Sequence, residues 1–256
     1  MTSRKEQLDQ LYKTYNRKEY VSPDPLQFLY DYPDVRDREI VGLIASSLAY
    51  GRVAQILKSV DKVLTPMGKT PYDFLADTPN AKLKKIYKGF KHRFTTDEEL
   101  VSLLNGMRKV INKHGSLNGC FIAGANKSDE TIISALQHFT DSLQCEGNYL
   151  IPSPAGGSAC KRLHLFLRWM VRKDTVDPGG WKGVSKAKLI VPLDTHMARI
   201  GQMMGFTHRK TANIKMAKEI TDSLAQFYSK DPVKYDFALT RFGIREELSI
   251  SSLKQA

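Results

Sequence analysis

Residues 156–171 read GGSACKRLHLFLRWMV, and residues 191–205 read VPLDTHMARIGQMMG. In the first stretch, a glycine-containing turn leads into apolar residues at helical spacing, with Lys161 at the start of the helical pattern. In the second, Asp194 precedes Thr-His-Met, a position where aspartate commonly caps a helix N-terminus. Backbone N–H groups of a turn that precedes a helix are suited to bind an anion such as a phosphodiester. The two stretches therefore predict two helices, and the first begins at a candidate phosphate site.

Helical spacing extends over most of the chain. We expect helices over 37–49, 53–64, 129–143, 162–171, 195–204, 212–228 and 232–241. Thr96 and Glu99 stand at capping-box spacing and predict the start of another helix. Strand-like alternation is nearly absent, and its best candidate is 189–191. Turn-rich loops are expected over 145–157 and 174–188. The sequence thus predicts an all-α protein, 1–256, forming a single unit with two helical lobes at about 22–145 and 150–256.

Composition limits the classes of function. The 256 residues carry a formal net charge of +12, with 41% hydrophobic and 26% charged residues, which is typical of a globular protein. No stretch approaches the roughly 20 apolar residues of a membrane span, and the polar start does not resemble a signal peptide, so we expect a cytoplasmic protein. Basic runs at 82–93 and 161–173 contain no acid. They favour an anionic partner, with nucleic acid ahead of a membrane surface or a phosphorylated metabolite.

Metal and cofactor sites are not indicated. Cys120, Cys145 and Cys160 form no C-x-x-C pair, so neither a structural zinc site nor a cysteine-held iron–sulfur cluster is expected. Asp31, Asp34 and Asp37 are better explained as turn and cap residues than as ligands of a nuclease metal. The sequence therefore predicts neither a metal nor a cofactor.

Residues 158–206 resemble the helix-hairpin-helix DNA glycosylase superfamily of base-excision repair. The signature of that superfamily is a Leu-Pro-Gly-Val-Gly-x-Lys-like hairpin followed by Val-Pro-Val-Asp-Thr-His, an Arg and Leu-Gly. Lys161 matches the lysine of its bifunctional members and Asp194 their catalytic aspartate, while the second hairpin glycine falls on Ala159. The long spacing from lysine to aspartate resembles the archaeal 8-oxoguanine glycosylases. The whole chain is also similar to a conserved bacterial family with Ala-Tyr-Gly-Arg and Leu-Phe-Leu-Arg-Trp-Met segments.

The resemblance implies a fold, a reaction and a partner. The two lobes would enclose a central cleft that receives a nucleotide extruded from double-stranded DNA. The enzyme, a monomer in the bacterial cytoplasm, would release a damaged base, such as the oxidised purine 8-oxoguanine, and then cut the strand as an AP lyase. Lys161 would attack the sugar and form a Schiff base, which requires its neutral amine. Asp194 would stabilise positive charge developing on the sugar and shuttle the proton.

Further site residues follow from the same resemblance. Trp169 and Trp181 would line the base pocket. The residues expected to contact DNA are Tyr50, Gly51, Arg52, Gly157, Ser158, Arg162, Arg168, His196 and Arg199.

Other functions stay open at this point. The chain could be a non-catalytic helix-hairpin-helix protein that binds double-stranded DNA and uses Lys161 only to contact phosphate. The presence of both Lys161 and Asp194 favours the enzyme, because a DNA-binding module does not need the pair. A basic RNA-associated helical protein is a third possibility, but no RNA-binding signature accompanies it.

Overall fold

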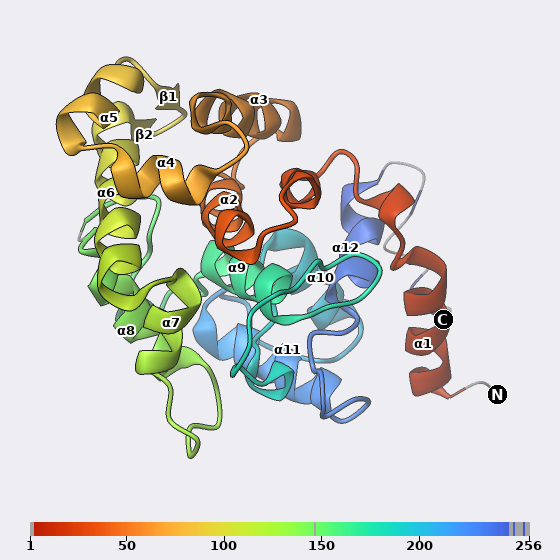
Figure 1. The fold of residues 1–256 in the computed structure, drawn as a ribbon. Coiled ribbons are helices and arrows are strands. Elements are labelled where there is room, and N and C mark those ends of the chain that lie inside the picture. Colours follow the sequence, from red (N-terminus) through yellow and green to blue (C-terminus); the bar gives the residue numbers. More distant parts are fainter. Residues whose placement is uncertain (1–2, 146, 246–247, 249–252, 254–256) are drawn as a thin grey trace. The chain divides into compact units, whose positions relative to one another are not determined.

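The computed structural model describes residues 3–145, 147–245, 248 and 253. Helices dominate this part of the chain, and its only sheet is a two-stranded antiparallel hairpin (Figure 1). The all-α prediction is therefore confirmed. Among the described residues, no helix is both long enough and apolar enough to cross a membrane.

The chain divides into two compact units. Unit 1 comprises 1–22, 157–179 and 184–256, and unit 2 comprises 23–156 and 180–183. Each unit draws on separated parts of the sequence. The first 22 residues belong with the C-terminal segments, and four residues of the long predicted loop belong with the N-terminal segments.

Unit 2 is organised around its longest helix, α6. The helix begins with the predicted capping box, in which Thr96 Oγ1 accepts from the Glu99 amide and the Glu99 carboxylate accepts from the Thr96 amide. It ends at Gly115, whose φ of 76° is left-handed. Helices α4, α5, α7 and α8 all pack against α6 (Figure 1). The elements of unit 2 are η2 (Pro25–Asp31), α2 (Val35–Ser47), α3 (Val53–Leu64), η3 (Thr65–Met67), α4 (Pro71–Asp77), α5 (Asn80–Ile86), β1 (Lys91–His92), β2 (Thr95–Thr96), α6 (Asp97–His114), α7 (Leu117–Ala123), α8 (Ile133–Leu143) and η4 (Pro154–Gly156).

Helix α2 is the buried helix of unit 2. Every residue from Glu39 to Ser47 is buried, including the carboxylate of Glu39. That carboxylate accepts from the amides of Leu117 and Asn118 at 2.6 and 3.0 Å and so satisfies the N-terminus of α7. The Trp181 indole donates to it at 2.8 Å, which ties residues 180–183 to this unit.

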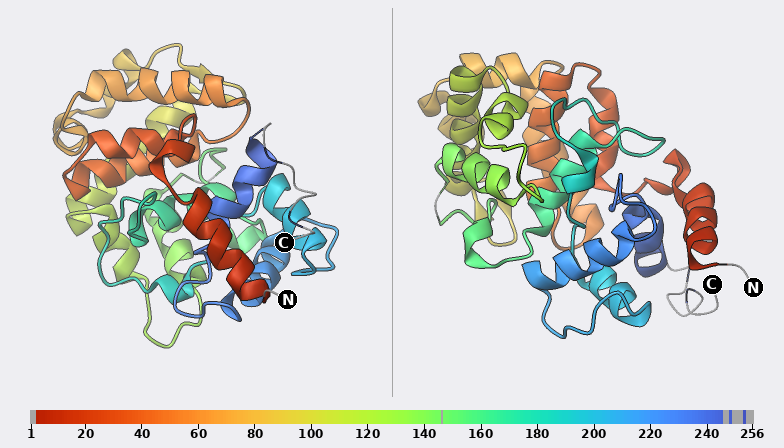
Figure 2. Two further views of the ribbon diagram at one scale, coloured as in Figure 1. Left: turned by 90° about the vertical axis from the view of Figure 1, so that its right-hand side faces the viewer. Right: turned by 90° about the horizontal axis from the view of Figure 1, so that it is seen from below.

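Unit 1 joins the two ends of the described chain. Helix α1 packs against α12, and α10 packs against both α11 and α12 (Figure 2). Asp9 of α1 accepts from Lys234 Nζ at 2.6 Å and from the Tyr235 hydroxyl at 2.8 Å, just before α12. The elements of unit 1 are α1 (Arg4–Tyr15), η1 (Lys18–Tyr20), α9 (Lys161–Val171), η5 (Lys186–Lys188), α10 (Thr195–Met203), α11 (Ile214–Ala225) and α12 (Asp236–Ile244).

The predicted helices are found, with ends shifted by a few residues. The α3 range is as predicted, whereas the segment expected at 129–143 becomes helical only at Ile133. The strand candidate at 189–191 was wrong. Its residues are buried, but the Val191 amide donates to the Thr221 hydroxyl rather than to a neighbouring strand. The short helices α4, α5 and α7 were not predicted, because each spans only about two turns and too few residues repeat to show a period.

Candidate active site

The structure brings Lys161 and Asp194 together in unit 1. Lys161 is the first residue of α9, and Asp194 is the N-cap of α10. Lys161 Nζ lies 3.8 Å from Asp194 Oδ2, and the two side chains are 33% and 21% exposed. A pair that is half-buried yet accessible can both interact internally and meet a ligand. The register expected from the sequence thus places an amine beside a carboxylate.

The backbone of α10 orients Asp194. Its Oδ1 accepts from the Met197 amide at 2.8 Å, which confirms the predicted cap. The cap occupies Oδ1, while Oδ2 is the atom that faces Lys161. One carboxylate therefore serves the helix and the pair at once, and the helix start fixes its direction.

Two predicted DNA contacts lie on α10. Arg199 is exposed, as a phosphate contact requires. His196 is half-buried against α12, and a Cβ added at Gly243 would lie only 2.5 Å from its Nδ1. Gly243 therefore leaves the space that the imidazole of His196 occupies against α12.

A tight turn precedes Lys161. Gly157 and Cys160 both have left-handed backbones, with φ of 72° and 42°. The Ser158 hydroxyl accepts from the Cys160 amide at 3.2 Å, and the Gly157 carbonyl accepts from Ile214 at 3.3 Å. Gly157 and Ser158 are exposed, and the predicted contact Arg162 is half-buried on the first turn of α9. The turn is thus anchored to the start of α11 and leaves its glycine and serine in solvent.

The prediction that Arg168 contacts DNA is corrected by its burial. Arg168 is only 4% exposed, and its guanidinium pairs with Asp177 at 3.2 Å and with Asp236. Arg172, the C-cap residue of α9, is also buried and pairs with Asp177, with Asp231 at 3.0 Å and with Asp174 at 2.8 Å. Two arginines of the basic run 161–173 therefore face inward. The spacing of four residues places both on one side of the helix, but it does not distinguish a buried side from an exposed one.

Burial and ion pairing shift the pKa values of the acids around these arginines in opposite directions. The buried network is defined here as Arg168, Arg172, Asp174, Asp177, Asp231 and Asp236. Burial raises the pKa of Asp177 to about 6, although both arginines lower it. Burial likewise raises the pKa of Asp236, and the charge of Asp194 raises it further. The Arg168 guanidinium, which pairs with Asp236, lowers the same pKa.

Both tryptophans that were predicted to line a base pocket are buried. Trp169 is fully buried in unit 1. Trp181 is 6% exposed in unit 2, where it packs against Phe121 and Phe139 and donates to Glu39. Both base-pocket predictions are therefore corrected. A buried indole serves here as core, and its apolar area outweighs any preference for the surface.

The predicted DNA-facing turn of unit 2 consists of Tyr50, Gly51 and Arg52, between α2 and α3. The Tyr50 hydroxyl donates to the His92 carbonyl at 2.8 Å and lies 2.6 Å from the Thr95 hydroxyl, so Tyr50 is half-buried against the β1–β2 hairpin. Gly51 has a φ of 96°, and Arg52 is the N-cap residue of α3. Gly51 and Arg52 are exposed. The six basic residues of 82–93 are exposed as well.

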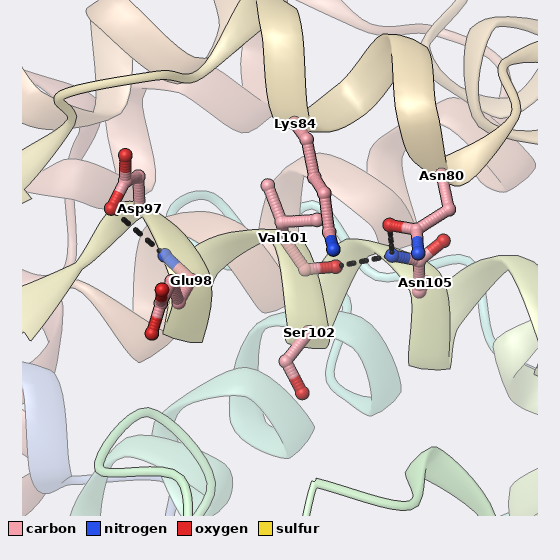
Figure 3. Close-up of a pocket in the computed structure, with 7 residues that line it drawn as sticks. All are labelled: Asn80, Lys84, Asp97, Glu98, Val101, Ser102 and Asn105. Atoms are coloured by element: carbon pink, nitrogen blue, oxygen red, sulfur yellow. Dashed lines mark hydrogen bonds between the residues drawn. The ribbon is translucent and has the colours of Figure 1, made fainter.

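Unit 2 also contains a pocket of about 460 Å³ between α5 and α6 (Figure 3). Lys84 reaches from α5 toward Val101 and Asn105, and Asn105 Nδ2 donates to Asn80 Oδ1 at 2.6 Å. The pocket does not pair a nucleophile with a base. Its lining residues are Asn80, Lys84, Asp97, Glu98, Val101, Ser102 and Asn105. Among the residues that the structure describes, no group of three His, Cys, Asp or Glu side chains could hold a metal ion.

One family model matches the chain. The family described as "Protein of unknown function (DUF2400)" matches residues 24–245. The chain belongs to this family. No curated protein matches it, and no solved structure matches it. The DUF2400 match includes Lys161, Asp194 and the buried network, whereas α1 (Arg4–Tyr15) precedes the matched range.

Proposed function

We propose that this DUF2400 protein is a DNA glycosylase of the helix-hairpin-helix type with AP lyase activity, acting on an oxidised purine such as 8-oxoguanine. One observation carries the proposal, namely the 3.8 Å approach of Lys161 Nζ to Asp194 Oδ2 with both groups partly exposed. An amine beside a carboxylate supports Schiff-base chemistry on a sugar, because the carboxylate can accept the proton that the amine must lose.

The reaction uses the pair in sequence. The neutral amine of Lys161 attacks C1′ of the deoxyribose, and the glycosidic bond breaks, so that the base leaves with the bonding electrons and takes up a proton. Loss of the amine proton and opening of the sugar ring give an iminium at C1′. Loss of a C2′ proton then expels the 3′ phosphate by β-elimination. Asp194 supports the positive charge that develops at C1′ and relays protons.

The choice of nucleic acid as partner rests on charge. The net charge of +12 and the exposed basic residues of 82–93 favour a polyanion. The exposed Arg199 and the Gly157–Ser158 turn supply phosphate contacts close in sequence to the pair. Release of counterions from DNA would make this binding strongly dependent on salt.

A borohydride trap tests the proposal. The protein is incubated with labelled duplexes that carry 8-oxoguanine, other damaged purines or an abasic site, and borohydride reduces any iminium to a stable amine. We expect a covalent adduct that Lys161→Gln abolishes and that Asp194→Asn forms about 100-fold more slowly. Lys173→Gln is the matched control, because Lys173 is an exposed lysine of the same basic run.

The other outcomes are equally informative. Base release without an adduct keeps a glycosylase but removes Lys161 as its nucleophile. Duplex binding with neither base release nor adduct across the panel contradicts the proposal and supports the alternative, a non-catalytic double-stranded DNA-binding protein. The exposed basic surface favours that alternative as the second candidate.

A further inference from the structure

The β1–β2 hairpin of unit 2 presents an aromatic ring to solvent. Arg93 and Phe94 form its two-residue tip, between the paired residues His92 and Thr95. Phe94 is 67% exposed, more than any other large hydrophobic residue that the structure describes. An exposed phenylalanine at a hairpin tip contributes little to the core of its own unit.

A second exposed aromatic residue lies beside the first. Tyr149 is 44% exposed, and its ring centre lies 5.8 Å from that of Phe94 and 5.1 Å from that of Tyr50. The Tyr149 amide donates to Glu99 at the start of α6. Three rings from separated parts of unit 2 thus form one aromatic patch, defined here as Tyr50, Phe94 and Tyr149.

The base of the hairpin is fixed. His92 is fully buried, with Nδ1 2.9 Å from the Ser59 hydroxyl and Nε2 3.1 Å from the Tyr50 carbonyl. Thr95 is fully buried beside the Tyr50 hydroxyl. The exposed tip therefore projects from a rigid support, and ordering the Phe94 ring on binding would cost little entropy.

The patch is flanked by cations. The Arg93 guanidinium lies over the Phe94 ring at 5.5 Å, and the Arg93 side chain passes so close to Gly51 that a Cβ there would lie 2.7 Å from Arg93 Cδ. Arg52 follows Gly51 directly, and Lys91 lies on β1. Arg52, Lys91 and Arg93 are all exposed. Rings interleaved with positive charges match the alternating bases and phosphates of a nucleic-acid strand.

From this arrangement we infer that the aromatic patch is a stacking surface for unpaired bases of a nucleic-acid strand, with Phe94 as the principal contact and Arg52 and Arg93 on the adjacent phosphates. The inference rests on the proposed nucleic-acid partner but not on the Lys161 chemistry. Stacking is tolerant of sequence because every base has an aromatic face. The surface would therefore select strands with an exposed base rather than a particular sequence.

The test uses the full-length protein with Lys161→Gln, so that chemistry does not interfere. Fluorescence anisotropy measures its affinity for a short labelled single-stranded DNA. Adding Phe94→Ala should weaken binding about 5- to 100-fold. Adding Arg93→Gln should lower the slope of log affinity against log salt by about 0.7. Ile122→Ala is the matched control and should change neither quantity, because Ile122 is another exposed hydrophobic residue of unit 2, at 39%.

A fluorescence measurement distinguishes direct stacking of residue 94 on DNA from an effect of the Phe94→Ala substitution on folding. The Phe94→Trp variant should keep its affinity and gain an emission that bound DNA quenches. Equal affinities of the Phe94→Ala and Ile122→Ala proteins, or no binding of single-stranded DNA at all, would overturn the inference. The inference would also be overturned if Phe94→Ala weakened binding to anionic phosphatidylserine vesicles and left binding to DNA unchanged.

The two proposals fail in different ways. Phe94-dependent binding without a Lys161 adduct would overturn the glycosylase and leave the stacking surface. A Lys161 adduct with Phe94-independent binding would overturn the stacking surface and leave the glycosylase.

Discussion

The indole N–H of Trp181 donates to the buried carboxylate of Glu39 at 2.8 Å, across 142 positions of sequence. The same carboxylate accepts from the Leu117 and Asn118 amides. Burial raises the pKa of Glu39 to about 7, although the three donors lower it. One titratable group thus connects α2, the N-terminus of α7 and the segment 180–183.

Glu39 should make unit 2 less stable as the pH rises. Its native carboxyl keeps a proton between about pH 4.5 and 7, where the unfolded chain has lost it, so the unfolded state binds fewer protons. The free energy of unfolding should fall across this window by about 3 kcal/mol from this group. In a Trp169→Phe background, the Trp181 emission should titrate with a midpoint near pH 7. Glu39→Gln should abolish this titration. If the Trp181 emission of that variant still titrates near pH 7, another group is responsible.

His164 should make unit 1 less stable as the pH falls, which is the opposite of the effect of Glu39 on unit 2. It is fully buried, its Nδ1 lacks a hydrogen-bond partner, and burial lowers its pKa to about 4. The unfolded chain binds the proton more readily, so stability is lost as the pH falls below about 6.5. Urea unfolding should show that His164→Leu removes about 2 kcal/mol of the destabilisation between pH 7 and pH 5. Equal pH dependence in the wild type and the variant would contradict the assignment.

Arg168 should be a structural residue rather than a DNA contact. Arg168→Met leaves Asp236, already fully buried, without its guanidinium, and Asp177 with only Arg172. We expect a loss of about 3–5 kcal/mol in the free energy of unfolding. Arg199→Met, on the exposed face of α10, should stay within about 0.5 kcal/mol. If Arg168→Met instead weakens DNA binding and leaves the free energy of unfolding unchanged, Arg168 is a DNA contact rather than a structural residue.

Gly243 should control the placement of His196. Gly243→Ala puts a Cβ 2.5 Å from His196 Nδ1, so the imidazole must move, and Asp194 lies two residues before it. We expect slower adduct formation in the borohydride assay. His196→Ala should restore much of the loss in the double variant, because it removes the clash. Additive losses would show that the two residues act independently.

Local chemistry made part of this structure predictable. The capping box of Thr96 and Glu99 and the cap at Asp194 depend on neighbours three residues away, and both appear as expected. The meeting of Lys161 with Asp194 came from a family resemblance rather than from spacing. The roles of Arg168 and Trp181 were missed because their partners, Asp236 and Glu39, lie far away in sequence. Burial of a charge is decided by such distant partners, which no local pattern encodes.

The packing of α1 on α12 also constrains how the protein is made. Asp9 is synthesised well before its partners Lys234 and Tyr235, which follow it by 225 and 226 positions. The residues of unit 2 end at Gly183, so all of them have been synthesised before α12. Helix α1 is meanwhile without α12, so the packing of these two helices forms only after α12 has been synthesised. The aromatic patch of unit 2 would then form before the helix packing of unit 1 is complete.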